Sequence, residues 1–350
     1  MHLEKFNYNI PESLIALTPK TPRDKSKIVV VDKNLKLFDF EKIVDLLEPK
    51  DALVFNETKV IGANLEGFIG KSKVSVNLNR LIKKQNGVTW SALIKSNKKV
   101  KKNQLISFSK NFFAKIIKSK IFSDSKFFFL YFNYNYQTFR RKLCTFGKTP
   151  LPPYIKKKRK IKTSDIKSYQ TIFARKEGAV AAPTASLHFT NKLLEKIQKK
   201  KIKIIKVTLH VSAGTFLPIR KKNIHDHKMH YEFGHITKKA SIEINKTKKN
   251  GGRVIAVGTT VLRLLESSKN ELGFVKPFKG ETNIFIKPGW KIETIDGLIT
   301  NFHTPRSSLI ILVVSILGEI KTQNLYEYAV KKKLRFYSYG DACLIWKKNE

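Results

Sequence analysis

The feature that most constrains the fold is a change in the period of the hydrophobic residues near residue 66, which is reversed near residue 148. Before the first change, KIVVVD (residues 27–32) and DALVFN (51–56) have the short apolar pattern of buried strands. The amphipathic segment FDFEKIVDLLEPK (38–50) between them predicts a helix. Strands that alternate with helices favour a parallel sheet with helices on its faces. The first 65 residues therefore indicate the α/β class.

Between residues 66 and 148 the pattern is that of a β domain. Apolar and polar residues alternate in KVSVNLNRLI (73–82), the turn signal QNG follows, and VTWSALIK (88–95) continues the pattern. Three further β-rich segments come next, with no convincing helix among them: NQLISFS, FFAKIIKS and KFFFLYFNYN. Five or six short strands in succession predict a small antiparallel barrel or sandwich.

This β-rich segment ends at a proline cluster, Pro150, Pro152 and Pro153, because proline interrupts both sheets and helices. After about Thr163 the α/β pattern resumes, with strands and helices in KIIKVTLH (203–210), GGRVIAV (251–257), GTTVLRLLESS (258–268) and DGLITNFH (296–303). We therefore predict a largely parallel sheet with flanking helices and an inserted small antiparallel β-barrel. The α/β catalytic domain would comprise residues 1–65 and 149–350, and the β-barrel domain residues 66–148.

Polar side chains gather where the predicted strands end. Ligands of open α/β sheets bind at the carboxyl ends of strands, where loops meet helix N-termini. The residues expected there are Thr184, His188, His210, Thr215, Gly258, Thr259, Thr260, Asn301 and His303. Singly, each has a structural explanation, such as an N-cap or a hydrogen-bonded core histidine. Because burying them without partners would cost roughly 1–3 kcal/mol each, together they favour a binding pocket.

Composition limits the class of protein. A chain of 350 residues with 41% hydrophobic and 11% aromatic residues is long enough for two folded domains. Cys144 and Cys343 fit neither a disulfide framework nor a CxxC metal motif, which indicates a reducing cytoplasm. The N-terminus has no signal-peptide pattern, and the most apolar run, Leu309–Leu317, is shorter than the ~18 residues of a membrane span. We expect a soluble cytoplasmic protein.

The formal net charge of +42 has two explanations. Lysines near phosphates release counterions, so the charge supports a nucleic-acid partner. However, only 11 of the 69 basic residues are Arg, whose planar fork matches phosphate best, and an A/T-rich coding sequence would also enrich Lys. The basic run after the prolines is either a solvated face or a phosphate contact. The candidate RNA-binding residues in it are Lys156, Lys157, Lys158 and Arg159.

The segment HDHKMHYEFGH (225–235) contains four histidines, but their spacing matches no familiar zinc motif. A polar loop over the pocket, with Glu232 as its carboxylate, is the favoured interpretation, so we expect no metal. The chain also lacks GxGxxG, Walker, HExxH and GxSxG patterns. Common nucleotide-binding, metalloprotease and esterase functions lose their usual support.

Several segments together resemble the successive motifs of one enzyme family, S-adenosylmethionine:tRNA ribosyltransferase-isomerases of queuosine biosynthesis. These segments are VAAPTASLHFT, VTLHVSAGTF, HKMHYE, GGRVIAVGTTVLRLLES, GETNIFI, ITNFHTPRSSL and FYSYGDACLI. FNYNIPESLIA, RDKSKIVVVD and LVFNETKVIGANL are similar to the opening of the family, and PLPPYI and YQTIFARKEGAVAAPT to its middle. The resemblance covers nearly the whole chain, is weaker in the insert, and implies an α/β domain with an inserted β-barrel.

The resemblance implies a reaction in which S-adenosylmethionine is consumed as a cosubstrate, with no true cofactor. Its ribosyl part goes to the aminomethyl group of 7-aminomethyl-7-deazaguanine at the wobble position of tRNA and isomerises, giving epoxyqueuosine, adenine and methionine. A base must accept a proton from the amine, whose unperturbed pKa is around 10. A proton must also leave the carbon next to the sulfonium, and adenine needs one as it departs. The family further suggests a monomer.

Residue roles follow from this chemistry. An imidazole with a pKa near 6.5 can both accept and donate a proton. His188 and His210 are therefore the expected catalytic residues, with Glu232 as a third candidate. Thr259, Thr260 and the helix behind them would hold the methionine carboxylate. Phe216 would stack on adenine or deazaguanine, and the residues expected to bond ribose or base edges are Asn301, His303 and Asp341.

The sequence departs from the family at a few positions. Ser186 and Ser212 stand where glycine is frequent, Asn64 replaces an Arg-like residue, and GTTVLRLLES differs from the usual Ser-Val-Arg-Thr run while keeping Arg263 and Glu266. A serine in a tight loop matters only if a positive φ is required.

Two rival functions remain open at this stage. A non-catalytic RNA-binding protein would explain the charge and the β insert, but not the polar strand ends. A methyltransferase that uses the same cosubstrate usually has a glycine-rich turn after its first strand, and VVVDKNLK lacks it.

Overall fold

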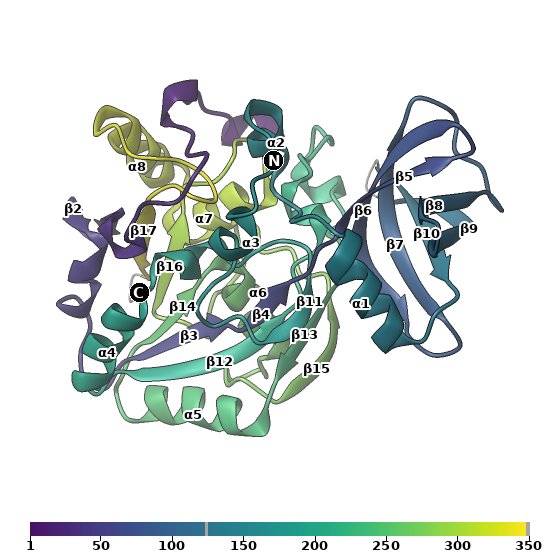
Figure 1. The fold of residues 1–350 in the computed structure, drawn as a ribbon. Helices are drawn as coiled ribbons and strands as arrows, with labels where there is room; N and C mark the ends of the chain where they lie inside the picture. Colours follow the sequence, from purple (N-terminus) through teal and green to yellow (C-terminus); the bar gives the residue numbers. More distant parts are fainter. Residues whose placement is uncertain (123–124, 348–350) are drawn as a thin grey trace.

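The computed structural model describes residues 1–122 and 125–347, apart from the side chain of Phe216. Its main body is built on a nine-stranded sheet (Figure 1). In spatial order the strands are β15 (Phe278–Thr282), β13 (Glu232–Ile236), β12 (Lys203–Leu209), β3 (Ala52–Asn56), β14 (Val254–Val257), β16 (Gly297–Asn301), β17 (Ala342–Trp346), β1 (Lys27–Val31) and β2 (Leu35–Asp39).

The sheet is mixed, so the prediction of a largely parallel sheet is correct only for its centre. Strands β12, β3, β14 and β16 run parallel, as does the pair β17–β1. Pairing is antiparallel for β15–β13, β13–β12, β16–β17 and β1–β2. The segment between β1 and β2 is too short for a crossover helix, which forces that pair to be antiparallel.

Helices cover both faces of the sheet because its central strands are apolar on both sides. One face packs against α4 (Asn191–Lys199) and the 3₁₀ turn η4 (Phe40–Val44). The other packs against four helices, α5 (Lys238–Lys249), α6 (Thr259–Ser268), α7 (Ser308–Leu317) and α8 (Glu319–Lys331). The helix predicted for residues 38–50 is wrong, because residues 35–39 pair with β1 and leave only the turn η4.

The remaining short elements lie in the connections. Two are brief helices, α2 (Pro153–Lys158) and α3 (Asp165–Ser168), and two strands, β4 (Thr58–Val60) and β11 (Lys176–Ala179), pair in parallel. The other 3₁₀ turns are η1 (Leu3–Phe6), η2 (Glu12–Leu14), η3 (Arg23–Lys25), η5 (Thr184–His188), η6 (Ala213–Phe216) and η7 (Ile224–Asp226).

The insert is a separate six-stranded antiparallel sheet that lies to one side of the main body (Figure 1). Its strands are β5 (Asn64–Ile69), β6 (Ser72–Lys83), β7 (Val88–Ser96), β8 (Leu105–Ser109), β9 (Phe112–Phe122) and β10 (Ser125–Phe132). The order β10-β7-β6-β5-β8-β9 closes on itself, since β10 pairs with both β7 and β9.

The insert also contains a helix that the sequence analysis missed, α1 (Tyr136–Phe146). Asn135 caps it by accepting a hydrogen bond from the Thr138 amide at 2.8 Å. Phe139 and Leu143, four residues apart, pack into the core of the insert.

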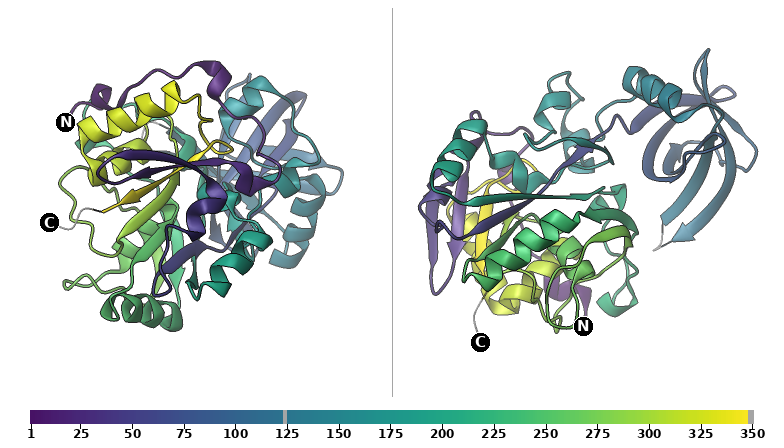
Figure 2. Two further views of the ribbon diagram at one scale, coloured as in Figure 1. Left: turned by 90° about the vertical axis from the view of Figure 1, so that its left-hand side faces the viewer. Right: turned by 90° about the horizontal axis from the view of Figure 1, so that it is seen from below.

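Two passages of chain join the insert to the main body, and they touch each other (Figure 2). Asn64 and Lys148 exchange backbone hydrogen bonds of 3.1 and 2.8 Å. Beside them, a Cβ on Gly62 would lie 2.8 Å from the Gly147 carbonyl oxygen, and a Cβ on Gly147 would lie 2.0 Å from that of Gly62. Only glycine fits at either position, and we call this crossing the neck.

No single helix among the described residues is long and apolar enough to cross a membrane. The pair α7 and α8 passes that test only when taken together, and it bends by 114°.

Candidate active site

A cavity of about 60 Å³, the first cavity, lies at the carboxyl ends of β14 and β16. Residues from distant segments form its wall, as expected for the edge of an open α/β sheet. It brings together seven of the predicted residues: Thr184, Thr215, Gly258, Thr259, Thr260, Asn301 and His303.

One wall of the first cavity is the N-terminus of α6. Gly258 is its N-cap with φ of +102°, a conformation that favours glycine, and its amide donates to the Ile299 carbonyl at 2.8 Å. The amides at the start of a helix lack intrahelical acceptors, and the helix dipole adds positive potential there. Thr259 and Thr260 therefore lie where an anionic group of a ligand would be stabilised.

Thr184 and Asn301 form a second wall, and a series of hydrogen bonds connects them through His188 to Ser26. Thr184 Oγ1 donates to Asn301 Oδ1 at 3.0 Å, and Asn301 Nδ2 lies 3.2 Å from His188 Nε2. On the other side of the ring, Ser26 Oγ lies 2.7 Å from His188 Nδ1, and Phe40 stacks on the ring at 4.7 Å.

His188 itself is 5% exposed and does not line the first cavity. Burial, together with the Arg335 and Arg23 guanidinium groups, lowers its pKa to about 3, so the imidazole is neutral. Both ring nitrogens already have partners. This geometry favours positioning of Asn301 over the catalytic role expected from the sequence.

His303 is the imidazole that lines the first cavity directly. Its Nε2 lies 2.8 Å from Thr300 Oγ1, and its amide donates to Tyr326 Oη at 3.0 Å. Burial lowers its pKa to about 3. A neutral imidazole with one engaged nitrogen therefore forms part of the wall.

His210, at the end of β12, is only half-buried. Its Nδ1 lies 2.8 Å from Thr58 Oγ1, and the Thr58 hydroxyl donates to the Lys176 carbonyl at 3.4 Å. The Thr58 hydroxyl thus engages Nδ1, and Nε2 has no hydrogen-bond partner among the described residues. Burial lowers the pKa of His210 to about 4.

His210 lines neither of two cavities itself, but its neighbours do. The next residue, Val211, lines the first cavity. The His210 ring packs against Gly178, where an added Cβ would lie 2.9 Å from three ring atoms. Gly178 lines a second cavity of about 290 Å³ at the neck.

Glu232, the third expected catalytic residue, is buried in an ion pair. Its Oε1 accepts from the Ser212 amide at 2.8 Å, and its Oε2 accepts from Arg263 Nη1 at 2.5 Å. A carboxylate with both oxygens engaged favours positioning of the 212–215 segment over proton transfer. Arg263 Nη2 has no partner within the described residues.

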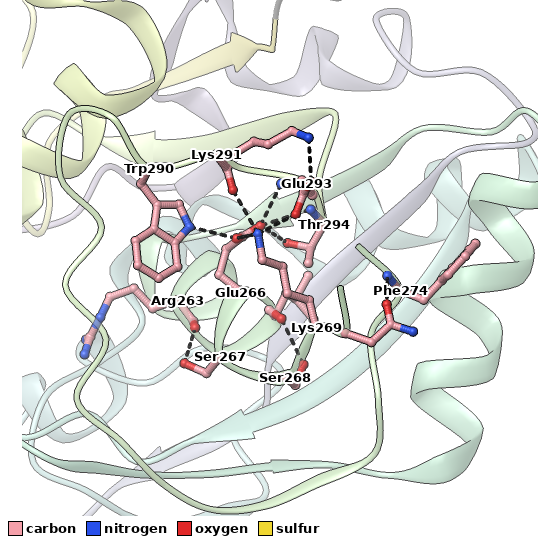
Figure 3. Close-up of polar contacts among 12 residues, drawn as sticks. Arg263, Glu266, Ser267, Ser268, Lys269, Phe274, Trp290, Lys291, Glu293 and Thr294 are labelled. Atoms are coloured by element: carbon pink, nitrogen blue, oxygen red, sulfur yellow. Dashed lines mark hydrogen bonds and ion pairs between the residues drawn. The ribbon is translucent and has the colours of Figure 1, made fainter. Parts of the chain in front are cut away.

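Glu266, one turn further along α6, belongs to a different network (Figure 3). It accepts from Trp290 Nε1 at 2.9 Å and from the Thr294 amide and hydroxyl at 3.0 and 2.8 Å. Figure 3 shows the Arg263 guanidinium pointing away from this network. Glu266 therefore anchors the 290–294 segment to α6 and lies outside the first cavity.

Asp341 does not reach the cavity. Its Oδ1 accepts from the Lys27 amide and its Oδ2 from the Arg335 amide, both at 2.8 Å. These two bonds tie the first residue of β1 to the loop at Arg335, and the expected contact of Asp341 with ribose or base stays a prediction. The side chain of Phe216, expected to stack on a base, lies outside the described part of the structure.

The histidines of residues 225–235 point to separate partners. His225 Nδ1 lies 2.9 Å from Lys287 Nζ, His227 packs on Phe285, and His230 packs on Phe122. Across residues 1–122 and 125–347, no group of three or more His, Cys, Asp or Glu side chains is placed to hold a metal ion.

The four predicted RNA-binding residues differ in availability. Arg159 donates to both oxygens of buried Asp165, at 2.8 and 2.7 Å, which makes it part of the structural framework. Lys158 pairs with Glu12, and half-buried Lys156 lies 3.5 Å from Asn77. Lys157 is the exposed member of the run that has no ion pair among the described side chains.

The aromatic side of the first cavity was not predicted from the sequence. Tyr154, Tyr337 and Ser338 line it, and the two tyrosine rings pack at 4.8 Å. The Ser338 amide donates to Tyr154 Oη at 2.9 Å. The tyrosines in PLPPYI and FYSYGD were the available signal, since both segments lie in motifs of the resemblance.

The chain is similar to known proteins over nearly its whole length. A family model described as "Queuosine biosynthesis protein" matches residues 3–345. Proteins named S-adenosylmethionine:tRNA ribosyltransferase-isomerase are similar to this chain, with 42% identity in Zymomonas mobilis and 43% in Brucella melitensis. Each alignment covers 99% of this chain, and 99% and 97% of the respective relatives.

A solved structure is also similar. The crystal structure of S-adenosylmethionine tRNA ribosyltransferase from Thermotoga maritima has a TM-score of 0.54 and 29% identity, and the match covers 97% of this chain and 99% of that one. The chain belongs to the queuosine biosynthesis protein family.

Proposed function

We propose that this protein transfers the ribosyl moiety of S-adenosylmethionine to 7-aminomethyl-7-deazaguanine at the wobble position of tRNA and isomerises it. The products are epoxyqueuosine in tRNA, adenine and methionine. The names of relatives with 42–43% identity over nearly their whole length support this activity. The observation that carries it is the first cavity, which gathers seven predicted residues from separate segments at one edge of the sheet.

S-adenosylmethionine would bind with its methionine carboxylate at the start of α6. The amides that follow Gly258 and the hydroxyls of Thr259 and Thr260 suit an anion. The cavity of about 60 Å³ is smaller than the roughly 300–1,000 Å³ pockets that hold drug-sized ligands. Binding of the whole cosubstrate therefore includes movement of the segment around Thr215.

His210 is the proposed general base for the amine. The Thr58 hydroxyl engages Nδ1, Nε2 would carry the lone pair in the Nδ1–H tautomer, and the ring is only half-buried. His303 lines the first cavity, so we propose that its imidazole contacts S-adenosylmethionine. His188 and Glu232 act as positioning residues through Asn301 and Ser212.

The tRNA would contact both the main body and the insert. A hollow of about 640 Å³ between them is lined by five basic residues, Lys148, Lys156, Arg159, Lys160 and Lys162. Phosphate contacts there would make affinity salt-dependent. We further propose that residues 66–148 form a separate barrel domain, and that the enzyme is a cytoplasmic monomer that needs no cofactor besides the consumed cosubstrate.

The deciding experiment combines the protein, S-adenosylmethionine and tRNA that carries the aminomethyl precursor. Mass spectrometry of the digested nucleosides should show epoxyqueuosine, and the supernatant should contain adenine and methionine in equal amounts. S-adenosylhomocysteine in their place would indicate a methyltransferase. The absence of any heat on titration with S-adenosylmethionine would indicate a non-catalytic RNA-binding protein.

A further inference from the structure

The second cavity lies where the insert meets the main body, and the proposed function assigns no substrate to it. Its volume of about 290 Å³ is near the lower end of the roughly 300–1,000 Å³ range of small-molecule pockets. The insert contributes three aromatic rings to its wall, those of Trp90, Tyr136 and Phe139. The main body contributes Val60 and Ile61, so the lining suits a flat, mainly apolar ligand.

One buried donor in this wall has no partner. Trp90 is 2% exposed, and its Nε1–H makes no hydrogen bond within the described residues. A buried unpaired N–H costs roughly 1–3 kcal/mol, and a ligand with a hydrogen-bond acceptor would remove that cost. Stacking surfaces combined with such a donor are typical of sites that hold an unstacked base of RNA.

The rim of the second cavity adds both signs of charge. Glu177 lies 3.1 Å from Lys59 Nζ and also pairs with Arg140, and all three residues line the cavity. A carboxylate accepts from the N1–H and N2 amino groups of a guanine-type base, whereas the corresponding edge of adenine presents an acceptor at N1. Glu177 Oε1 and Oε2 already accept from Lys59 and Arg140, so a base would use the remaining lone pairs of this carboxylate.

The second cavity is also next to the proposed general base. Gly178 lines it, and the lack of a side chain on Gly178 lets the His210 ring pack directly against the backbone. Val211, the next residue, lines the first cavity. His210 itself lines neither cavity, but one neighbour, Gly178, lines the second cavity and the other, Val211, lines the first.

We propose that the second cavity holds the 7-deazaguanine base of the tRNA, flipped out of its stack, while the first cavity holds S-adenosylmethionine. This assignment rests on the proposed function. The base would stack among the aromatic rings, its O6 accepting from Trp90 Nε1 and its N1–H and N2 amino groups donating to Glu177. Its aminomethyl group would then face Gly178, against which the His210 ring packs.

Cys144 provides a direct probe of this assignment. It is exposed and lines the second cavity, whereas Cys343, the other cysteine of the chain, is buried and its thiol pKa is raised to about 12 by burial. Iodoacetamide should therefore alkylate Cys144 selectively. The rate of its carbamidomethylation can be followed by mass spectrometry of the intact enzyme and its peptides.

The free base 7-aminomethyl-7-deazaguanine and the precursor tRNA should each protect Cys144, and S-adenosylmethionine alone should not. At a ligand concentration ten times its Kd, only the unoccupied fraction reacts, so alkylation should slow about tenfold. Equal protection by S-adenosylmethionine would assign the cavity to the cosubstrate and overturn the proposal. Unchanged alkylation with saturating precursor tRNA would overturn it as well.

A substitution tests the donor itself. Trp90→Phe keeps an aromatic ring but removes Nε1–H, and we expect KM for precursor tRNA to rise about 3- to 10-fold, as for the loss of one hydrogen bond. Trp346→Phe, at the far end of β17, is the matched control and should leave KM unchanged. A KM for Trp90→Phe equal to that of the control would contradict the assignment.

The proposed function and the assignment of the second cavity can be refuted independently of each other. If the unmodified enzyme releases no adenine from S-adenosylmethionine with precursor tRNA, the proposed function is wrong. If adenine is released but precursor tRNA leaves Cys144 unprotected, the function stands and only the assignment of the second cavity is wrong.

Discussion

His188 and His210 lie at the same edge of the sheet, but they differ in how many of their ring nitrogens have hydrogen-bond partners. At His188, both ring nitrogens have side-chain partners, Ser26 and Asn301, and the ring is stacked and buried. At His210, Thr58 binds only Nδ1, and the ring is half-buried against Gly178. Because only His210 has a ring nitrogen without a partner among the described residues, the comparison favours His210 over His188 as the base.

The strongest test of this comparison is His210→Ala. Loss of a general base lowers turnover by roughly 10²- to 10⁴-fold, so adenine release should fall by that factor. Affinity for tRNA, measured by filter binding, should stay within a few-fold because the phosphate contacts are unchanged. Wild-type turnover in this variant would remove His210 from the mechanism.

Thr58→Val tests the hydroxyl that binds His210 Nδ1. Removal of a hydrogen-bonding partner behind an active imidazole typically costs roughly 10- to 100-fold in activity, and Thr58→Ser should restore most of it. ¹⁵N NMR of the ring should show one dominant tautomer in the wild type and mixed tautomers in the valine variant. A lowered turnover with an unchanged NMR tautomer would mean that Thr58 acts only through packing.

His188→Gln examines the other half of the comparison through acid stability. The folded pKa of His188 is about 3 and its unfolded value is ~6.5, so between these pH values the unfolded chain binds the proton and the folded chain does not. The free energy of unfolding therefore falls as pH falls below ~6.5, by up to about 1.4 kcal/mol per pH unit for this group. Urea unfolding at pH 7.5, 6 and 5 should show a shallower pH dependence in the variant. Identical slopes would mean that the ring takes up its proton without unfolding.

Ser26→Ala is the smallest change and the counterpart of Thr58→Val, since each hydroxyl binds a histidine Nδ1. Loss of one buried hydrogen bond should lower the free energy of unfolding by about 0.5–1.5 kcal/mol. Turnover at saturating substrates should stay within two- to three-fold of the wild type, roughly the effect of a slight shift in Asn301. A turnover loss as large as that of Thr58→Val would show that His188 takes part in proton transfer.

The position of the first cavity could be predicted because the ends of central strands are readable as apolar runs followed by polar residues. Gly258 and Thr259 follow β14 directly, Asn301 is the last residue of β16, and the parallel order of those strands brings them together. The sequence could not show that β17 returns antiparallel to β16, so the mixed character of the sheet was missed.

Individual roles were harder to predict than the location. Whether an imidazole is free depends on partners far away in the chain, such as Ser26 for His188 and Thr58 for His210. Asp341 looked available, but backbone amides of Lys27 and Arg335 use both of its oxygens. Such long-range hydrogen bonds cannot be read from the local sequence. For that reason the sequence did not distinguish residues that could transfer a proton from residues that hold other side chains in place.

Gly62 and Gly147 do more than let two passages of chain meet, because both also line the second cavity. Any rotation of the insert about this point changes the separation between Trp90 on one wall and Val60 on the other. A molecule that fills the cavity therefore selects one orientation of the insert. Binding effects of this kind are reciprocal. A long polynucleotide that contacts both the insert and the main body would favour the same orientation of the insert. Its contacts remote from the reacting base would therefore raise the affinity of the second cavity for that base.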